Sequence, residues 1–223
     1  YRYFEDLNYA ELSKINKKVD LGILGGFPII INKKIFSKTK LGFLNCHAGA
    51  LPAYRGGSPL NWQIINNEKN FSISVIKVSK KIDSGKIIDQ KKFKLRSKYD
   101  INDLHKIANK NFPKLVKNSM KKISIGYKGQ KQDTKKSKYY PQRTPHDSKV
   151  NLKKILFKEL KLMVRALQSP YPNVFFNFRQ KKVKISNVSL STKHLLPGEI
   201  LRKKKLIYFG GKDKTVKSFI NFK

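Results

Sequence analysis

Asn45 and His47 are the two side chains whose types and spacing could do chemistry together. They follow the apolar run 41–44 and stand two positions apart. In a β-strand, residues i and i+2 project from the same face, so both side chains would face one site. An amide N–H can stabilise a developing oxyanion, and an imidazole exchanges protons near neutral pH. We therefore predict a site at the carboxyl end of this strand, where open α/β sheets bind ligands.

Asp83 is the expected third member of the site. It follows the alternating run 71–78, which predicts a strand. If that strand neighbours the strand at 41–45, the carboxylate could orient the imidazole and favour its protonated form. A donor, a proton carrier and an orienting group together indicate acyl transfer. Taken singly, a histidine at a strand end is more often structural, and Asp-Ser-Gly is more often an ordinary turn.

Cysteine and histidine spacing gives no sign of a metal centre. His105, His146 and His194 have no ligand spacing among themselves or with Cys46, so we expect no metal. The single cysteine allows no disulfide within these residues and fits a reducing compartment. No run approaches the roughly 18 apolar residues that a membrane span needs.

The elements that must position these residues alternate between strand and helix patterns. Expected strands lie at 20–27, 41–44, 71–78 and 86–95, followed by short strands at 174–178, 182–188, 198–201, 206–209 and 216–219. Expected helices lie at 1–18, 33–37 (capped by Asn32), 59–67 (capped by Ser58), 102–123 and 153–167. The polar stretch 126–138 is expected to be a linker, and 139–147, with two prolines, to lie extended on the surface.

The charge of the chain is strongly positive. Fifty Lys and Arg against 14 Asp and Glu give a net charge of +36, but only seven of the fifty are arginines. One interpretation is an electrostatic surface for nucleic acid or another polyanion. The other is compositional drift, since Lys, Asn and Ile are all abundant and the lysines are scattered. Because phosphate- and base-reading surfaces favour Arg, we attribute most of the charge to drift.

The combined motifs resemble one enzyme family. The stretch from Asn45 to Trp62 resembles the signature of the 10-formyltetrahydrofolate-dependent formyltransferases, with Asn-x-His, Leu-Pro and Arg-Gly in order. The turn 82–85 resembles the family's Asp-x-Gly. The stretch 139–147 is similar to the segment that joins the family's two domains, and 165–176 is similar to the entry to its C-terminal barrel.

The resemblance implies an α/β fold: a Rossmann-like parallel sheet followed by a small open β-barrel (OB-like) domain. It implies a catalytic domain at 1–138, a connector at 139–150 and a C-terminal domain at 151–223. Asn45 would hold the formyl oxygen, His47 would relay protons, and Asp83 would orient His47. Expected contacts to the folate co-substrate, 10-formyltetrahydrofolate, are Ile29, Ile30, Ile31, Ser79, Lys80, Lys81, Ile82 and Asp83. The expected substrate loop comprises Leu51, Pro52, Tyr54, Arg55, Gly56 and Gly57.

The resemblance also sets expectations for the partner and the compartment. The family's first strand is missing from the match, so we expect the chain to begin inside the catalytic domain. The stretch 55–68 looks closer to the sugar N-formyltransferases, which favours a nucleotide-linked amino sugar as acceptor. Initiator methionyl-tRNA is the alternative, and an inactive basic module that binds polyanions is the alternative of another class. We expect a cytoplasmic protein, with a homodimer as one expected assembly.

Overall fold

The computed structural model describes residues 19–27, 31 and 33–221. The chain divides into two compact units, which are described separately below. Unit 1 comprises Tyr1–Pro59, Asn70–Lys94 and Lys106–Pro141, and unit 2 comprises Leu60–Lys69, Leu95–His105 and Gln142–Lys223. The helix expected at 1–18 and the Asn32 cap lie outside the described residues.

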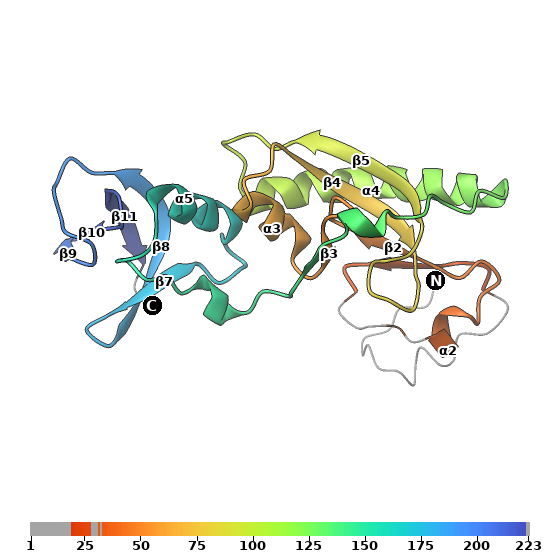
Figure 1. Ribbon diagram of the computed structural model, residues 1–223, viewed down its shortest axis with the longest axis horizontal. Coiled ribbons are helices and arrows are strands. Elements are labelled where there is room, and N and C mark those ends of the chain that lie inside the picture. Colours follow the sequence, from red (N-terminus) through yellow and green to blue (C-terminus); the bar gives the residue numbers. More distant parts are fainter. Residues whose placement is uncertain (1–18, 28–30, 32, 222–223) are drawn as a thin grey trace. The chain divides into compact units, whose positions relative to one another are not determined.

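A four-stranded sheet forms the framework of the described part of unit 1, with strand order β1-β2-β4-β5 (Figure 1). The strands are β1 (Gly22–Gly25), β2 (Phe43–His47), β4 (Asn70–Lys77) and β5 (Ile87–Lys94). The strand that carries Asn45 and His47 pairs with the strand of the alternating run that precedes Asp83, since His47 lies opposite Ser74. Strand directions are mixed: β1 and β2 are parallel, whereas β2–β4 and β4–β5 are antiparallel. The short connection 78–86 explains the last pair, because parallel strands need a long crossover.

Strand β4 is the central element of this sheet, and its sequence explains why. Phe71, Ile73, Val75 and Ile76 are all buried, as expected for a strand with neighbours on both sides. Helix α4 (Ile101–Ser124), whose residues from Lys106 onward belong to unit 1, lies along β5 (Figure 1). The short helix α2 (Lys33–Phe36) adds a small core that contains Ile31, Ile35 and Phe43.

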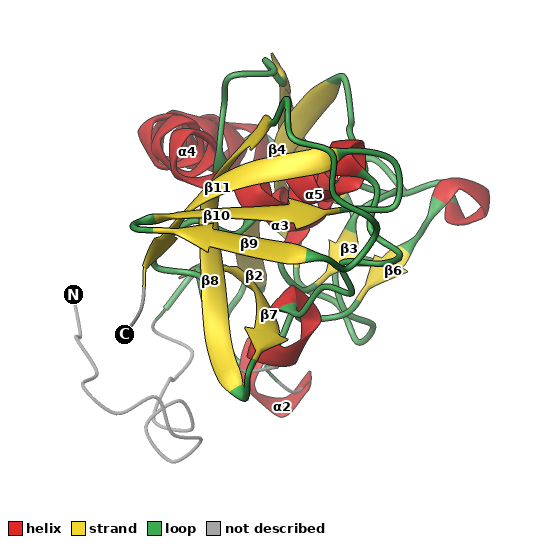
Figure 2. Ribbon diagram, turned by 90° about the vertical axis from the view of Figure 1, so that its left-hand side faces the viewer, coloured by secondary structure: helices red, strands yellow, loops and turns green. Residues whose placement is uncertain are grey.

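Unit 2 contains a curled antiparallel sheet with strand order β7-β8-β11-β10-β9 (Figure 2). The strands are β7 (Val174–Phe178), β8 (Lys181–Leu190), β9 (Ile200–Lys203), β10 (Leu206–Gly210) and β11 (Thr215–Asn221). Helix α5 (Phe157–Ala166) lies in unit 2, which also contains helix α3 (Pro59–Ile65) from Leu60 onward and the first residues of α4, up to His105. Alternate residues of β8, such as Val183 and Ile185, are buried, which is the period-2 pattern of a one-sided sheet. The predicted α/β class, with a Rossmann-like first part and a small barrel-like second part, is confirmed.

Several local predictions were wrong. The helix expected from 153 begins only at Phe157, because Asn151 organises a turn in which its carboxamide oxygen and backbone carbonyl accept from the next residues. Ser58 stands directly before α3, as predicted, but with φ 48°, whereas an N-cap residue normally has β-region dihedrals. The stretch 139–147 is not simply extended, since it contains strand β6 (Tyr139–Tyr140) and the 3-10 helix η2 (Pro145–Ser148).

In the part of the chain that the structure describes, no helix is long and apolar enough to cross a membrane.

Candidate active site

The Asp83 carboxylate is the centre of a cluster of polar groups in unit 1. Its Oδ1 accepts a hydrogen bond from Asn45 Nδ2 at 3.2 Å, and its Oδ2 accepts from the Gly56 backbone N–H at 2.9 Å. Oδ2 also lies 3.4 Å from His47 Nδ1, and the two side chains are only 9% and 5% exposed. The structure therefore brings together the three side chains that the sequence indicated, and it shields those of His47 and Asp83 from most water. Polar contacts in such a site are stronger than in solvent.

The turn that carries Asp83 has an unusual backbone. Asp83 lies in the loop between β4 and β5 with φ 48°, a left-handed conformation that Asp tolerates better than most residues. A Cβ at Gly85 would overlap the backbone carbonyl of Lys77, so only glycine fits there. The Asp-x-Gly spacing is thus a packing requirement of the turn that delivers the carboxylate.

The His47 ring is held from its second nitrogen as well. Nε2 lies 2.5 Å from the Tyr54 carbonyl oxygen. A carbonyl can only accept, so Nε2 carries a hydrogen in this arrangement. A Cβ at Gly49 would overlap both the His47 ring and the Tyr54 carbonyl. The missing side chain at Gly49 is therefore what allows this contact.

Asn45 is positioned to donate to a ligand. Its amide nitrogen carries two hydrogens, of which one is used by Asp83. Among the described residues the second hydrogen has no partner, so it can stabilise an oxyanion. Cys46 lies between Asn45 and His47 on β2, and burial raises its pKa to about 11. It is therefore a neutral thiol near pH 7, in keeping with a packing role.

The predicted substrate loop forms one wall of the cluster. Leu51 and Tyr54 are buried, and strand β3 (Arg55–Gly56) pairs in parallel with β6. The Tyr54 and Tyr140 rings are stacked, with centroids 4.9 Å apart. The loop residues Pro52 and Gly57 add backbone hydrogen bonds to the same segment: Lys138 N–H donates to the Pro52 carbonyl and Gly57 N–H to the Tyr140 carbonyl. A segment that the sequence presented as linker and connector is thus paired with the substrate loop.

Gln132 is a residue of the site that sequence reasoning missed. Its Oε1 accepts from Arg55 Nε and Nη2, and its Nε2 donates to the carbonyls of Asp83 and Gly85. It lies in the polar stretch 126–138, which has no periodicity that would single it out.

The predicted folate contacts are only partly within the described residues. Ile29 and Ile30 lie outside them. Ile31 is buried in a cluster that Val78 also contacts, directly before the loop 79–83. In that loop the Ser79 hydroxyl bonds to the Lys81 carbonyl and to the Ser84 hydroxyl, while Lys80 and Ile82 are exposed.

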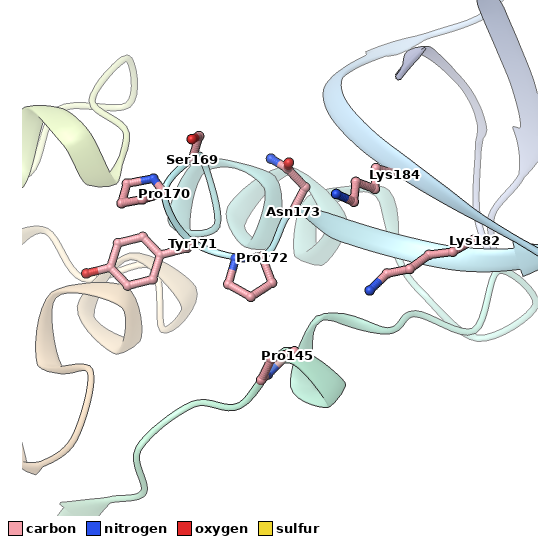
Figure 3. A pocket seen from close by; sticks show the side chains of 8 residues that line it. All are labelled: Pro145, Ser169, Pro170, Tyr171, Pro172, Asn173, Lys182 and Lys184. Carbon is pink, nitrogen blue, oxygen red and sulfur yellow. The ribbon is translucent and has the colours of Figure 1, made fainter. Parts of the chain in front are cut away.

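A hollow of about 520 Å³ lies in unit 2, but the side chains around it are less suited to catalysis than the Asp83 cluster (Figure 3). It is lined by Pro145, Ser169, Pro170, Tyr171, Pro172, Asn173, Lys182 and Lys184. No carboxylate lines it, and the Tyr171 hydroxyl is already bonded to His105 Nε2 at 2.6 Å. We therefore place the candidate active site at the Asp83 cluster. Among the described residues, no group of His, Cys, Asp and Glu could hold a metal ion.

Comparison with known families agrees with this geometry. Residues 5–118 match the Formyl transferase family, and residues 143–218 match the Formyl transferase C-terminal domain. The chain belongs to the formyl transferase family. The matched segments include Asn45, His47 and Asp83, and the earlier resemblance is confirmed.

Curated relatives include two kinds of protein. The bifunctional polymyxin resistance protein ArnA of Wigglesworthia glossinidia brevipalpis is 32% identical over 188 residues, which are 80% of this chain and 27% of that protein. The methionyl-tRNA formyltransferase of Pediococcus pentosaceus is 25% identical over 207 residues, which are 88% of this chain and 62% of that protein. The chain thus spans less than two thirds of the length of these relatives.

Solved structures share the fold. HypX from Aquifex aeolicus, in complex with tetrahydrofolic acid, has a TM-score of 0.70 at 21% identity, covering 94% of this chain and 36% of that one. An N-formyltransferase from Helicobacter canadensis, in complex with folinic acid and dTDP-3-aminofucose, has a TM-score of 0.69 at 20% identity, covering 97% and 78%.

Proposed function

We propose that this chain carries a formyl-transfer centre that moves a formyl group from 10-formyltetrahydrofolate to the primary amine of a nucleotide-linked amino sugar. The observation that carries the proposal is the set of contacts from the Asp83 carboxylate to Asn45, His47 and the Gly56 N–H. Such a constellation provides an oxyanion donor and a proton carrier within one site. It lies in a chain that belongs to the formyl transferase family.

When bound, the folate supplies the formyl carbon and leaves as tetrahydrofolate. Asn45 donates its second Nδ2–H to the formyl oxygen as that oxygen gains negative charge. Asp83 fixes the rotation of the Asn45 amide by accepting its other hydrogen. The Asn45 amide is therefore already oriented before the reaction begins, so its ordering does not add to the activation barrier.

His47 relays a proton from the attacking amine to the departing nitrogen of tetrahydrofolate. Asp83 faces Nδ1 of the His47 ring, and the Tyr54 carbonyl contacts Nε2. Proton exchange at Nε2 therefore requires the ring to move away from that carbonyl. The loop Leu51–Gly57 lies beside the acceptor. Ile31 and the loop 79–83 would contact the pterin.

The sugar acceptor is supported by the stretch 55–68, which resembles the sugar N-formyltransferases, and by the similarity to an N-formyltransferase whose structure holds dTDP-3-aminofucose. Methionyl-tRNA is the second candidate, because several curated relatives are methionyl-tRNA formyltransferases and the net charge of +36 would attract RNA.

The test is a formyl-transfer assay of the full-length protein with 10-formyltetrahydrofolate. The acceptors are dTDP- and UDP-linked amino sugars and methionyl-tRNA, each with the wild type, His47→Ala and the control His194→Ala, an exposed histidine of unit 2. We expect transfer to a sugar that His47→Ala abolishes and His194→Ala retains. Transfer to methionyl-tRNA alone would reassign the acceptor. No transfer, with polyanion binding that falls steeply with salt, would instead support an inactive basic module.

A further inference from the structure

The carboxamide of Gln132 makes four hydrogen bonds, which is its full capacity. Its oxygen accepts from Arg55 Nε at 2.9 Å and from Arg55 Nη2 at 2.8 Å. Its nitrogen donates to the Asp83 carbonyl at 2.8 Å and to the Gly85 carbonyl at 2.7 Å. One side chain therefore connects the turn that carries Asp83 to the strand that carries Gly56.

These connections act on both ends of one contact in the site. The Gly56 N–H donates to Asp83 Oδ2, and Gly56 directly follows Arg55. The same carboxylate contacts Asn45 and His47. Holding the Asp83 and Gly85 carbonyls fixes the turn, and through the turn it fixes where the carboxylate lies.

The segment around Gln132 is itself held in place. The backbone two residues earlier exchanges both hydrogen bonds with Ile87, at 2.9 and 2.8 Å. Gly129 has φ 83° and would overlap the Ile88 and Lys86 side chains if it carried a Cβ. Asp133 caps the 3-10 helix η1 (Thr134–Lys136) by accepting from Lys135 N. Gln132 therefore projects from a backbone that is fixed on both sides.

We propose that Gln132 is a positioning residue for formyl transfer, which orients the Asp83 carboxylate toward Asn45 and His47 by holding the carbonyls of the 83–85 turn. The kinetic part of this inference rests on the proposed function. Its physical basis is that small displacements of a catalytic group cost much of its effect, while substrate binding by other groups is retained.

Two substitutions separate the two halves of the carboxamide. Gln132→Leu removes all four hydrogen bonds. Gln132→Glu keeps an acceptor for Arg55 but cannot donate to the Asp83 and Gly85 carbonyls. Lys131→Leu, at the exposed neighbouring position, is the matched control. If the turn is what matters, both Gln132 variants lose kcat by roughly 10- to 100-fold with little change in KM for the folate, and the control keeps its kcat.

A second measurement does not depend on turnover. The ring NMR signals of His47, identified by their loss in His47→Ala, should shift in both Gln132 variants and not in Lys131→Leu. A wild-type kcat and an unshifted His47 signal in Gln132→Glu would overturn the proposal, because Gln132 would then serve only Arg55. An unshifted signal in Gln132→Leu would also overturn it. If the wild type transfers no formyl group, the proposed function fails, and shifted His47 signals in both variants would still support the positioning role.

Discussion

Two histidines of this protein are paired with a polar side chain, and their surroundings differ. In unit 1, His47 is buried between the Tyr54 carbonyl and the Asp83 carboxylate, which itself accepts from Asn45 and Gly56. In unit 2, His105 is half-buried and contacts the Tyr171 hydroxyl.

The difference is one of charge. Burial lowers the pKa of His105 and raises the pKa of Tyr171, so both groups are favoured in their neutral forms. A neutral pair of this kind stabilises a fold. A carboxylate that accepts from the Asn45 amide and the Gly56 N–H, and that lies beside the His47 ring, fixes an amide and an imidazole in one site, which is what acyl transfer needs. Chemistry is therefore located by convergent polar groups, and not by the size of a hollow such as the one beside Tyr171.

Removing the negative charge of Asp83, which lies beside His47 in unit 1, should have the largest effect. Asp83→Asn keeps the shape of the side chain but replaces one carboxylate oxygen by an NH2 group, which cannot accept from Asn45 Nδ2 or from the Gly56 N–H. We expect kcat for formyl transfer to fall by roughly 10²- to 10⁴-fold. Asp89→Asn, which removes the ion pair with Lys122, is the control and should keep its kcat. Equal rates for the two variants would contradict the central role of Asp83.

Displacing the His47 ring without changing any polar group should come next. Gly49→Ala places a Cβ against the ring and the Tyr54 carbonyl. We expect kcat to fall by about 10²-fold, because the ring must leave its position. Gly25→Ala is the control, since a Cβ there meets nothing within 4 Å. A crystal structure of Gly49→Ala with His47 unmoved, or an unchanged kcat, would show that the close approach is not needed.

Breaking the His105–Tyr171 hydrogen bond in unit 2 should lower the stability of the protein but not its turnover. Tyr171→Phe removes one hydrogen bond, and we expect a loss of about 0.5–1.5 kcal/mol in the free energy of unfolding with kcat unchanged. Denaturant titration and the formyl-transfer assay check the two parts. A large loss of kcat in Tyr171→Phe would mean that this pair also serves the reaction.

The pH dependence of stability should report His105. Because its pKa in the folded protein is lowered, the unfolded chain binds its proton first as the pH falls. The stabilisation is therefore present above the ordinary histidine pKa and is lost below it. Denaturant titration between roughly pH 5 and 7 should show a smaller slope in His105→Gln than in the wild type. Identical slopes would contradict this assignment.

The smallest effect should be at Cys46, which lies between Asn45 and His47 on β2. With its pKa raised to about 11 by burial, the thiol should react slowly with iodoacetamide at pH 8 and faster as the pH approaches that value. Cys46→Ala should keep kcat within about threefold of the wild type, as expected for a buried structural cysteine. Fast alkylation at pH 8 together with loss of activity would instead place Cys46 in the site.

Sequence reasoning succeeded where the pattern was local. The alternation at 71–78 and the helical period at 102–123 became β4 and α4 within one or two residues. It failed where a side chain competed with the pattern, as at Asn151, whose turn delays the start of α5. It also interpreted 126–138 as a linker and 139–147 as an extended surface stretch, because residues that bond to a distant strand show no periodicity of their own.

What the sequence by itself determined is the content of the site. The i, i+2 spacing on a strand is enough to set Asn45 and His47 on one face, and the Asp-x-Gly spacing is enough to indicate the turn. Only the tertiary structure decided how these parts meet. The Tyr54 carbonyl on His47 and the Gln132 carboxamide on the Asp83 turn are contacts between segments brought together by the path of the backbone. Backbone carbonyls and a lone Gln in a polar stretch have no sequence signature, because every residue has a carbonyl and most polar side chains face solvent.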